Sequence, residues 1–147
     1  MTEEQQIVSH TPHTAITLDQ LGEIQPGLAR LMAEVSERYW ILYYAAEGGN
    51  WKLAALQSSE VQKALGIGVI TRPKYTAYIE AFIKGPMMAI NKAIEGRDWT
   101  AFKLAYETGI TTANAYHQAW EHEEIVWQLP DEPPKHLKLT SSEESSR

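Results

Sequence analysis

Residues 45–51 read AAEGGNW and residues 93–99 read AIEGRDW, so nearly the same seven letters occur twice. Each copy has the composition of a junction between two helices. Glycine ends a helix because it readily adopts the left-handed backbone conformation, Asn or Asp caps the helix that follows, and tryptophan opens that helix. The repeat therefore predicts two helical hairpins, which together make a four-helix bundle.

Apolar residues recur every three to four positions on either side of these junctions, which is the period of an α-helix. The first predicted helix starts near Pro26, and the second covers about residues 51–70 and ends before Pro73. The third contains Pro86, so we expect a kink near Ile83. The fourth follows the second junction. Four amphipathic helices of this length predict an all-α fold, an antiparallel four-helix bundle.

The two ends of the chain differ from this helical middle. Residues 1–16 are polar and are predicted to form a flexible N-terminal arm, ahead of a bundle that covers residues 17–129. Residues 130–147 are rich in proline and then in Ser and Glu, which predicts an extended strap followed by a disordered tail.

Composition excludes several classes of protein. The 147 residues are 44% hydrophobic, which suits one globular domain. The chain has no cysteine, which rules out disulfides, thiolate zinc sites and thioether-linked haem. A net charge of -6 without any basic block argues against a nucleic-acid partner. The sequence has no apolar run long enough to span a membrane.

The first residues are acidic and polar and do not resemble a secretory signal. We therefore expect a cytoplasmic protein, or a periplasmic one if a leader was replaced during cloning.

His117 is the strongest candidate for chemistry, because it lies on the apolar stripe of the fourth predicted helix between Ala113 and Trp120. A neutral imidazole in that position could bind a metal, or a haem iron, through one ring nitrogen. The alternative, and the more common case, is a core histidine with a single hydrogen bond to Tyr116, Tyr106 or a main-chain carbonyl. The pattern leaves both interpretations open.

Residues 111–117, TTANAYH, resemble the haem-attachment segment of the bundle-type c cytochromes, the cytochrome c′-like family. In that family a C-x-x-C-H motif lies late in the fourth helix of a four-helix bundle. The resemblance covers about residues 21–134. Its other pieces are residues 24–27, 38–45, 49–54, 72–73 and 127–134.

This chain departs from the family motif at both cysteines. Ala113 and Tyr116 occupy the two cysteine positions, while His117 keeps the position of the axial ligand. Covalent haem attachment is therefore impossible. Either His117 holds a haem or another flat apolar ligand without tethers, or Tyr116 fills the space and the bundle is haem-free. The bulk of Tyr116 favours the second outcome.

A ligand at His117 would need walls and an anion partner. The candidate walls are Tyr116 and Trp120 together with Tyr39, Tyr43 and Met87, and Arg38 is the candidate partner for a carboxylate such as a haem propionate. All of these also suit an ordinary bundle core, in which Met87 fills a gap. If haem is bound, the resemblance implies electron transfer or gas sensing.

The sequence contains no glycine-rich phosphate loop, nucleophile elbow or His-Glu-x-x-His motif, so we expect a protein that is not an enzyme. The alternative function is a haem-free interaction module that acts as a homodimer. Trp40 and Tyr44, which lie off the main stripe of the first helix, are the candidate interface.

Overall fold

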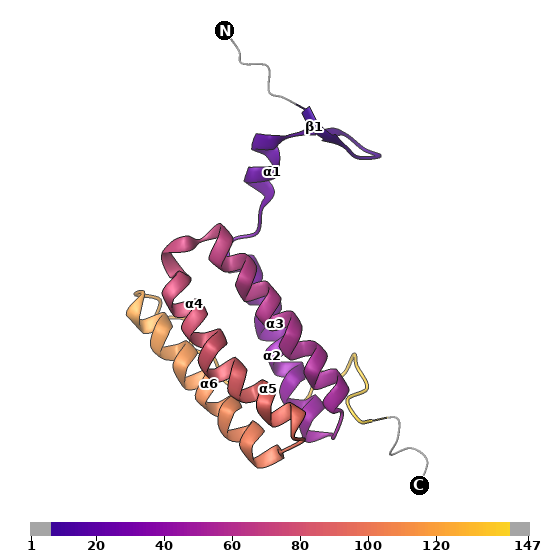
Figure 1. The fold of residues 1–147 in the computed structure, drawn as a ribbon, viewed down its shortest axis with the longest axis vertical. Coiled ribbons are helices and arrows are strands. Elements are labelled where there is room, and N and C mark those ends of the chain that lie inside the picture. The colour runs from indigo at the N-terminus through magenta and orange to yellow at the C-terminus, as the bar shows by residue number, and fades with distance from the viewer. Residues whose placement is uncertain (1–6, 142–147) are drawn as a thin grey trace.

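A computed structural model describes residues 7–141 of the chain, and these are predominantly helical, as the sequence predicts (Figure 1). Two short strands, β1 (Ile7–His10) and β2 (Ala15–Thr17), precede the helices. The helical elements are α1 (Leu18–Ile24), α2 (Leu28–Glu47), α3 (Trp51–Thr71), η1 (Pro73–Tyr75), α4 (Thr76–Phe82), η2 (Ile83–Met87), α5 (Met88–Glu95) and α6 (Trp99–Ala119). Within residues 7–141, no helix combines the length and apolarity that crossing a membrane requires.

The long helices lie side by side around one apolar core. Helix α2 packs along α3, α5 packs along α6, and α2 also contacts α6, so that the apolar faces of these helices meet in a common core (Figure 1). The core is built from the apolar stripes that the sequence shows, and Leu42, Val61 and Ile90 are each fully buried in it.

Both predicted helix caps are present at the repeated junctions. The side chain of Asn50 accepts a hydrogen bond from the amide of Leu53 at 3.1 Å, and Asp98 accepts one from the amide of Ala101 at 3.0 Å. At the second junction, the residue with the left-handed backbone conformation is not the expected glycine. Gly49 has φ 74° at the first, but Arg97 (φ 48°) takes that place at the second. Arginine is therefore held in a conformation that glycine adopts without cost.

The helical rod from α4 to α5 is irregular where the sequence predicts a kink. Residues Ile83–Met87 form η2, a π-helical turn that contains Pro86. Proline lacks an amide hydrogen and its ring crowds the preceding turn, and a π-turn is a common way to absorb such a disruption. The structure thus confirms the predicted position of the irregularity.

Tyr39 of α2 and Tyr106 of α6 join the two helices at the centre of the core. The hydroxyl of Tyr39 donates to the carbonyl of Tyr106 at 2.8 Å, and the hydroxyl of Tyr106 donates to the carbonyl of Tyr39 at 2.7 Å. Their rings stack with centroids 4.1 Å apart. Burial raises the pKa of both phenols, so both hydroxyls stay protonated and can donate.

Gly109 is required by this tyrosine pair, which gives a test of the core. A methyl group at Gly109 would collide with the hydroxyl of Tyr39, whereas nothing lies within 4 Å of one at Gly66. We expect Gly109→Ala to lower the free energy of unfolding by ~1–3 kcal/mol. The matched variant Gly66→Ala should raise it by up to ~1 kcal/mol, the usual gain inside a helix. Urea unfolding measures both, and two stabilising substitutions would contradict this packing.

The N-terminal segment is more ordered than the predicted flexible arm. Strands β1 and β2 pair antiparallel, and the turn between them is closed by a hydrogen bond from the amide of Thr11 to the carbonyl of Thr14 at 2.7 Å. The β-branched residues Ile16 and Thr17 suit a strand. Residues 1–6 of the predicted arm lie outside the described residues.

Helix α1 stands apart from the other helices, although the sequence predicts that the bundle begins at residue 17 (Figure 1). A complete capping box at Thr17 starts this helix. None of its residues is buried, and Leu18, Leu21 and Ile24 are between 41% and 67% exposed.

The segment predicted as a proline-rich strap is extended and lies on α2. The hydroxyl of Tyr44 donates to the carbonyl of Pro130 at 2.6 Å, and Nε1 of Trp40 donates to the carbonyl of Glu132 at 2.9 Å. Pro134 is buried. Residues 142–147 of the predicted disordered tail lie outside the described residues.

These contacts change the basis for the expected homodimer. Trp40 and Tyr44, the two residues chosen as its interface, bond to the chain's own strap. The homodimer stays a prediction, without support from these two side chains.

Candidate functional site

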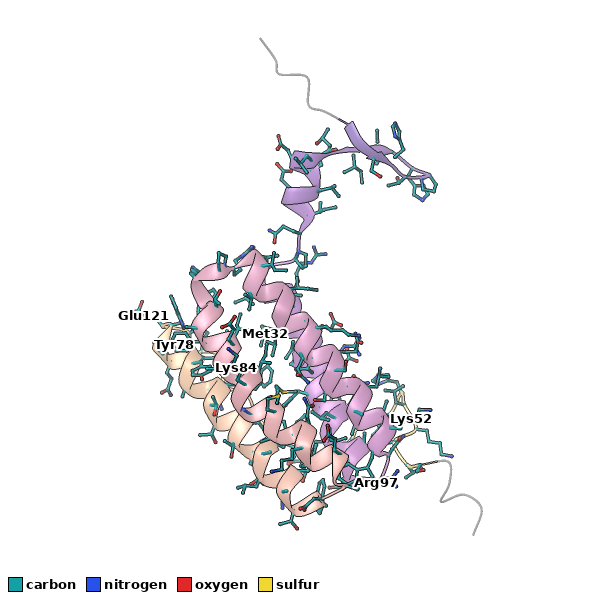
Figure 2. The ribbon with its side chains drawn as sticks, in the orientation of Figure 1. Met32, Lys52, Tyr78, Lys84, Arg97 and Glu121 are labelled. Carbon is teal, nitrogen blue, oxygen red and sulfur yellow. The ribbon has the colours of Figure 1, made fainter. Side chains whose placement is uncertain are left out.

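A cavity of about 690 Å³ lies beside the C-terminal part of α6 and is lined mainly by apolar side chains from α2, α4 and α6. Met32 of α2 and Tyr78 of α4, both labelled in Figure 2, are two of these residues. Four of the residues predicted from the sequence also line it: Ala113, Tyr116, His117 and Trp120. The C-terminal part of α6 thus faces a cavity large enough for a small organic ligand.

His117 is oriented by the segment that follows α6. Its Nδ1 lies 3.1 Å from the carbonyl oxygen of Ile125. A carbonyl only accepts hydrogen bonds, so Nδ1 must carry the hydrogen, which leaves the lone pair of Nε2 free in the neutral ring. Nε2 has no hydrogen-bond partner among residues 7–141. This is the tautomer and the support that metal-binding histidines use.

The surroundings of His117 also keep its ring neutral. Burial lowers the pKa of His117 below its ordinary value of 6.5, and this effect outweighs the hydrogen bond to Ile125, which acts in the opposite direction. At neutral pH the imidazole is therefore uncharged, the form in which a histidine can bind a metal.

Asn114 fixes the segment that orients His117. Its side chain donates to the carbonyl of Trp127 at 3.0 Å and accepts from the amide of Trp127 at 2.7 Å. The Trp127 ring lies 6.3 Å from the His117 ring and 5.6 Å from Tyr39. The sequence analysis predicted neither the role of Asn114 nor that of Trp127. The only local signal for this support of His117 is an asparagine three residues before it.

Aromatic rings from α4, η1 and α6 form one wall of the cavity. Tyr116 packs edge-on against Tyr78 with centroids 4.8 Å apart, and Trp120 packs edge-on against Tyr75 at 4.6 Å. Tyr116 is therefore part of the cavity wall, and the haem-free outcome that its bulk favours stays a prediction. The Nε1 atom of Trp120 is buried and unpartnered within the described chain.

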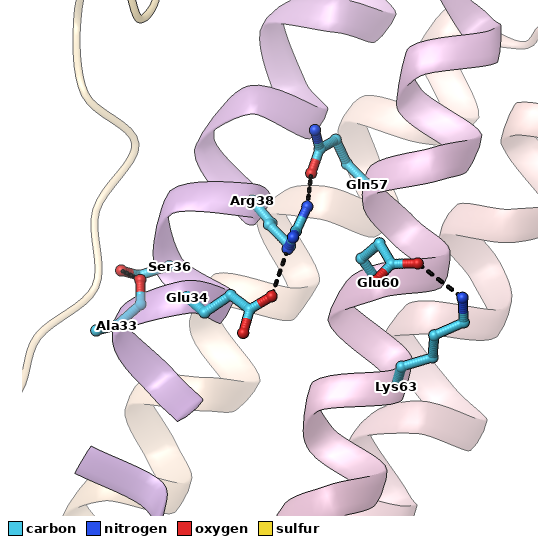
Figure 3. A network of polar contacts seen from close by, with 7 residues as sticks. All are labelled: Ala33, Glu34, Ser36, Arg38, Gln57, Glu60 and Lys63. Atoms are coloured by element: carbon cyan, nitrogen blue, oxygen red, sulfur yellow. Dashed lines mark hydrogen bonds and ion pairs between the residues drawn. The ribbon is translucent and has the colours of Figure 1, made fainter. Parts of the chain in front are cut away.

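The predicted anion partner Arg38 lies elsewhere. Figure 3 shows its side chain between α2 and α3, where Nε bonds to Glu34 at 2.9 Å and Nη1 bonds to Gln57 at 3.0 Å. Arg72 and Lys74, for which the sequence analysis predicted no role in the site, line the cavity instead.

The remaining predicted walls belong to the core and not to the cavity. Tyr39 and Met87 are buried, and Tyr43 is buried against Tyr106 and Trp99, with ring centroids 5.0 Å and 5.4 Å apart. None of the three lines the cavity.

A second hollow of about 500 Å³ lies between α3 and α5, and its wall includes the amide side chains of Gln62 and Asn91. The hydroxyl of Ser58 donates to Asn91 at 2.6 Å, and Gln62 donates to the same Asn91 oxygen at 3.2 Å. The amide groups of Gln62 and Asn91 are therefore already engaged within the protein.

A scan of protein-family models found no match for this chain, and searches of curated proteins and of solved structures found none either.

Proposed function

We propose that this chain is a non-enzymatic, antiparallel four-helix bundle related to the bundle-type c cytochromes. In this proposal it binds a haem, or a similar flat apolar ligand, without covalent attachment. His117 is the axial ligand through Nε2.

The observation that carries the proposal is the state of His117. Its Nδ1 is committed to the carbonyl of Ile125, its Nε2 has no partner among residues 7–141, and the residue lines the cavity. A bare metal ion would need three or four protein ligands, and the described residues contain no group of three or more His, Cys, Asp or Glu side chains that could hold one. A metal that is already held in a macrocycle needs only one imidazole.

The shape and chemistry of the cavity support a flat apolar ligand. Its volume of about 690 Å³ falls within the range of small-molecule sites. Most of the side chains that line it are apolar or aromatic, as in typical sites for small organic molecules. Tyr75, Tyr78 and Trp120 offer rings for stacking and for excluding water.

The chain's own residues have defined tasks in this proposal. The carbonyl of Ile125 holds the proton on Nδ1, and Asn114 holds the segment that carries this carbonyl. Bound iron would supply the redox or gas-binding chemistry. Because Ala113 and Tyr116 stand where the tethers would be, binding depends on non-covalent contacts and is reversible.

Titration with hemin tests the proposal. We expect the purified protein to shift the Soret band of micromolar hemin and to saturate at one hemin per chain. The same titration has a predicted pH dependence. A proton on Nε2 would block iron binding, and burial lowers the pKa of His117 below 6.5. Affinity should therefore stay constant from about pH 8 to about pH 7 and decrease only when the pH falls below the ordinary histidine range.

Two results would count against the proposal. The absence of any Soret shift at micromolar hemin would exclude haem as the ligand. A loss of affinity centred above pH 6.5, the ordinary pKa of histidine, would show that His117 is not the neutral ligand described above.

A further inference from the structure

The cavity carries a local charge opposite to that of the whole chain. Arg72 and Lys74 line it, and no Asp or Glu appears among the described residues of its wall. The chain as a whole has 19 acidic and 13 basic residues and a net charge of -6. A cavity with cations and no carboxylates in an acidic protein attracts an anionic group.

Arg72 has free donors that match a carboxylate. Its Nη1 donates to the carbonyl of Thr71 at 2.7 Å and bonds to the side chain of Gln25 at 3.3 Å. Its Nε and Nη2 bond to no residue of the described chain, and Arg72 has no acidic partner there. Nε and Nη2 form one edge of the planar guanidinium, and two parallel N–H donors match the two oxygens of a carboxylate.

The backbone at Gly27 leaves room for this guanidinium. A methyl group at Gly27 would collide with Nη2 of Arg72, so the close approach depends on the missing side chain. Gln25 and Thr71 bond to Nη1, which holds the planar group in position before any ligand arrives. A donor that is already positioned loses little entropy on binding.

Lys74 adds a second positive charge two residues further along the chain. Its Nζ lies 4.9 Å from the centroid of the Tyr75 ring, which itself lines the cavity. No acidic side chain pairs with Lys74 within residues 7–141.

We propose that Arg72, assisted by Lys74, forms a carboxylate-binding subsite of the cavity. The ligand is then a flat apolar molecule with carboxylates on one edge. This inference rests on the proposed function, because the cavity must first hold the apolar body of the same ligand. It goes beyond that function by naming the ligand's acidic edge and the residue that selects it.

The test compares hemin, which has two free carboxylates, with its dimethyl ester, which has none. We expect wild-type protein to bind hemin about 10- to 100-fold more tightly than the ester, the range expected for charge-assisted hydrogen bonds. Arg72→Gln should lower the affinity for hemin most of the way to that for the ester, with Lys74 providing the remainder, and should leave ester binding unchanged. Arg97→Gln is the matched control, because Arg97 lies at the opposite end of the helices from Tyr78 (Figure 2), and it should bind both probes as wild type does.

The outcomes separate this inference from the proposed function. If wild-type protein binds hemin and the ester equally well, the carboxylate subsite is wrong and the proposed function stands. If Arg72→Gln keeps the full preference for hemin, Arg72 is not the selecting residue and the inference fails. If neither probe binds, both proposals fail.

Discussion

Replacing His117 with alanine is expected to weaken hemin binding by more than about 100-fold, because losing an axial ligand should exceed the 10–100-fold cost of losing a supporting residue. His117 is the only described cavity residue with a neutral imidazole nitrogen that is both unpartnered and supported by a main-chain carbonyl. Its removal leaves the apolar walls intact, so residual binding should be weak and without the Soret shift. Titration of the variant with hemin measures both effects.

His122 provides the matched control for this substitution. It also lines the cavity, but its Nδ1 pairs with Glu124 at 3.1 Å and its side chain is 51% exposed. We expect His122→Ala to bind hemin as wild type does. An equal loss of hemin affinity in the two variants would mean that His117 is not the specific iron ligand.

Replacing Tyr106 with alanine is expected to lower the free energy of unfolding by ~3–5 kcal/mol, the range for removing a large ring from a core. Tyr106 is 1% exposed, stacks on Tyr39 and donates its hydroxyl to the carbonyl of that residue. A small domain is stable by only about 5–15 kcal/mol, so this variant would lose a large share of its stability.

The phenylalanine variant separates the ring from its hydroxyl. Tyr106→Phe keeps the stacked ring and loses one hydrogen bond, which should cost ~1 kcal/mol. Urea unfolding followed by circular dichroism compares the two variants. If Ala costs no more than Phe, the ring does not have the packing role that we assign to it.

Local signals in the sequence were enough to predict the helical framework. Asn50 and Asp98 each cap a helix by accepting a hydrogen bond from the amide three residues later. Pro86 disrupts the helical turn in which it lies, so each of these signals acts within about one turn of its own position. The exception, Arg97 in the left-handed conformation, shows that position in the turn decides the backbone conformation even where glycine is adjacent.

The candidate site was predictable only where it lies on one helix. Ala113, Tyr116 and His117 share the cavity because helical spacing brings them to one face of α6, and Trp120 caps the end of the same helix. Arg38 was misplaced because the surroundings of a side chain depend on which helix packs against it. The Arg38 side chain bonds to Gln57 of α3 and to Glu34, which lies one turn earlier on α2. The acidic neighbour at Glu34 was visible in the sequence.

The contacts that complete the site come from segments without a periodic pattern. Ile125 and Trp127 belong to the extended segment after α6, which folds back and hydrogen-bonds to His117 and Asn114. Arg72 directly follows the end of α3. Such long-range contacts leave no regular spacing in the sequence. The ordered hairpin before α1 was missed for a similar reason, because its strands are only three and four residues long.

A crystal structure of the protein grown with hemin tests the central claim most directly. We expect one macrocycle in the cavity, with its iron bonded to Nε2 of His117 and with Nδ1 still donating to the carbonyl of Ile125. Iron bonded to another residue, or a macrocycle seated outside the cavity, would contradict the assignment of His117 as the axial ligand.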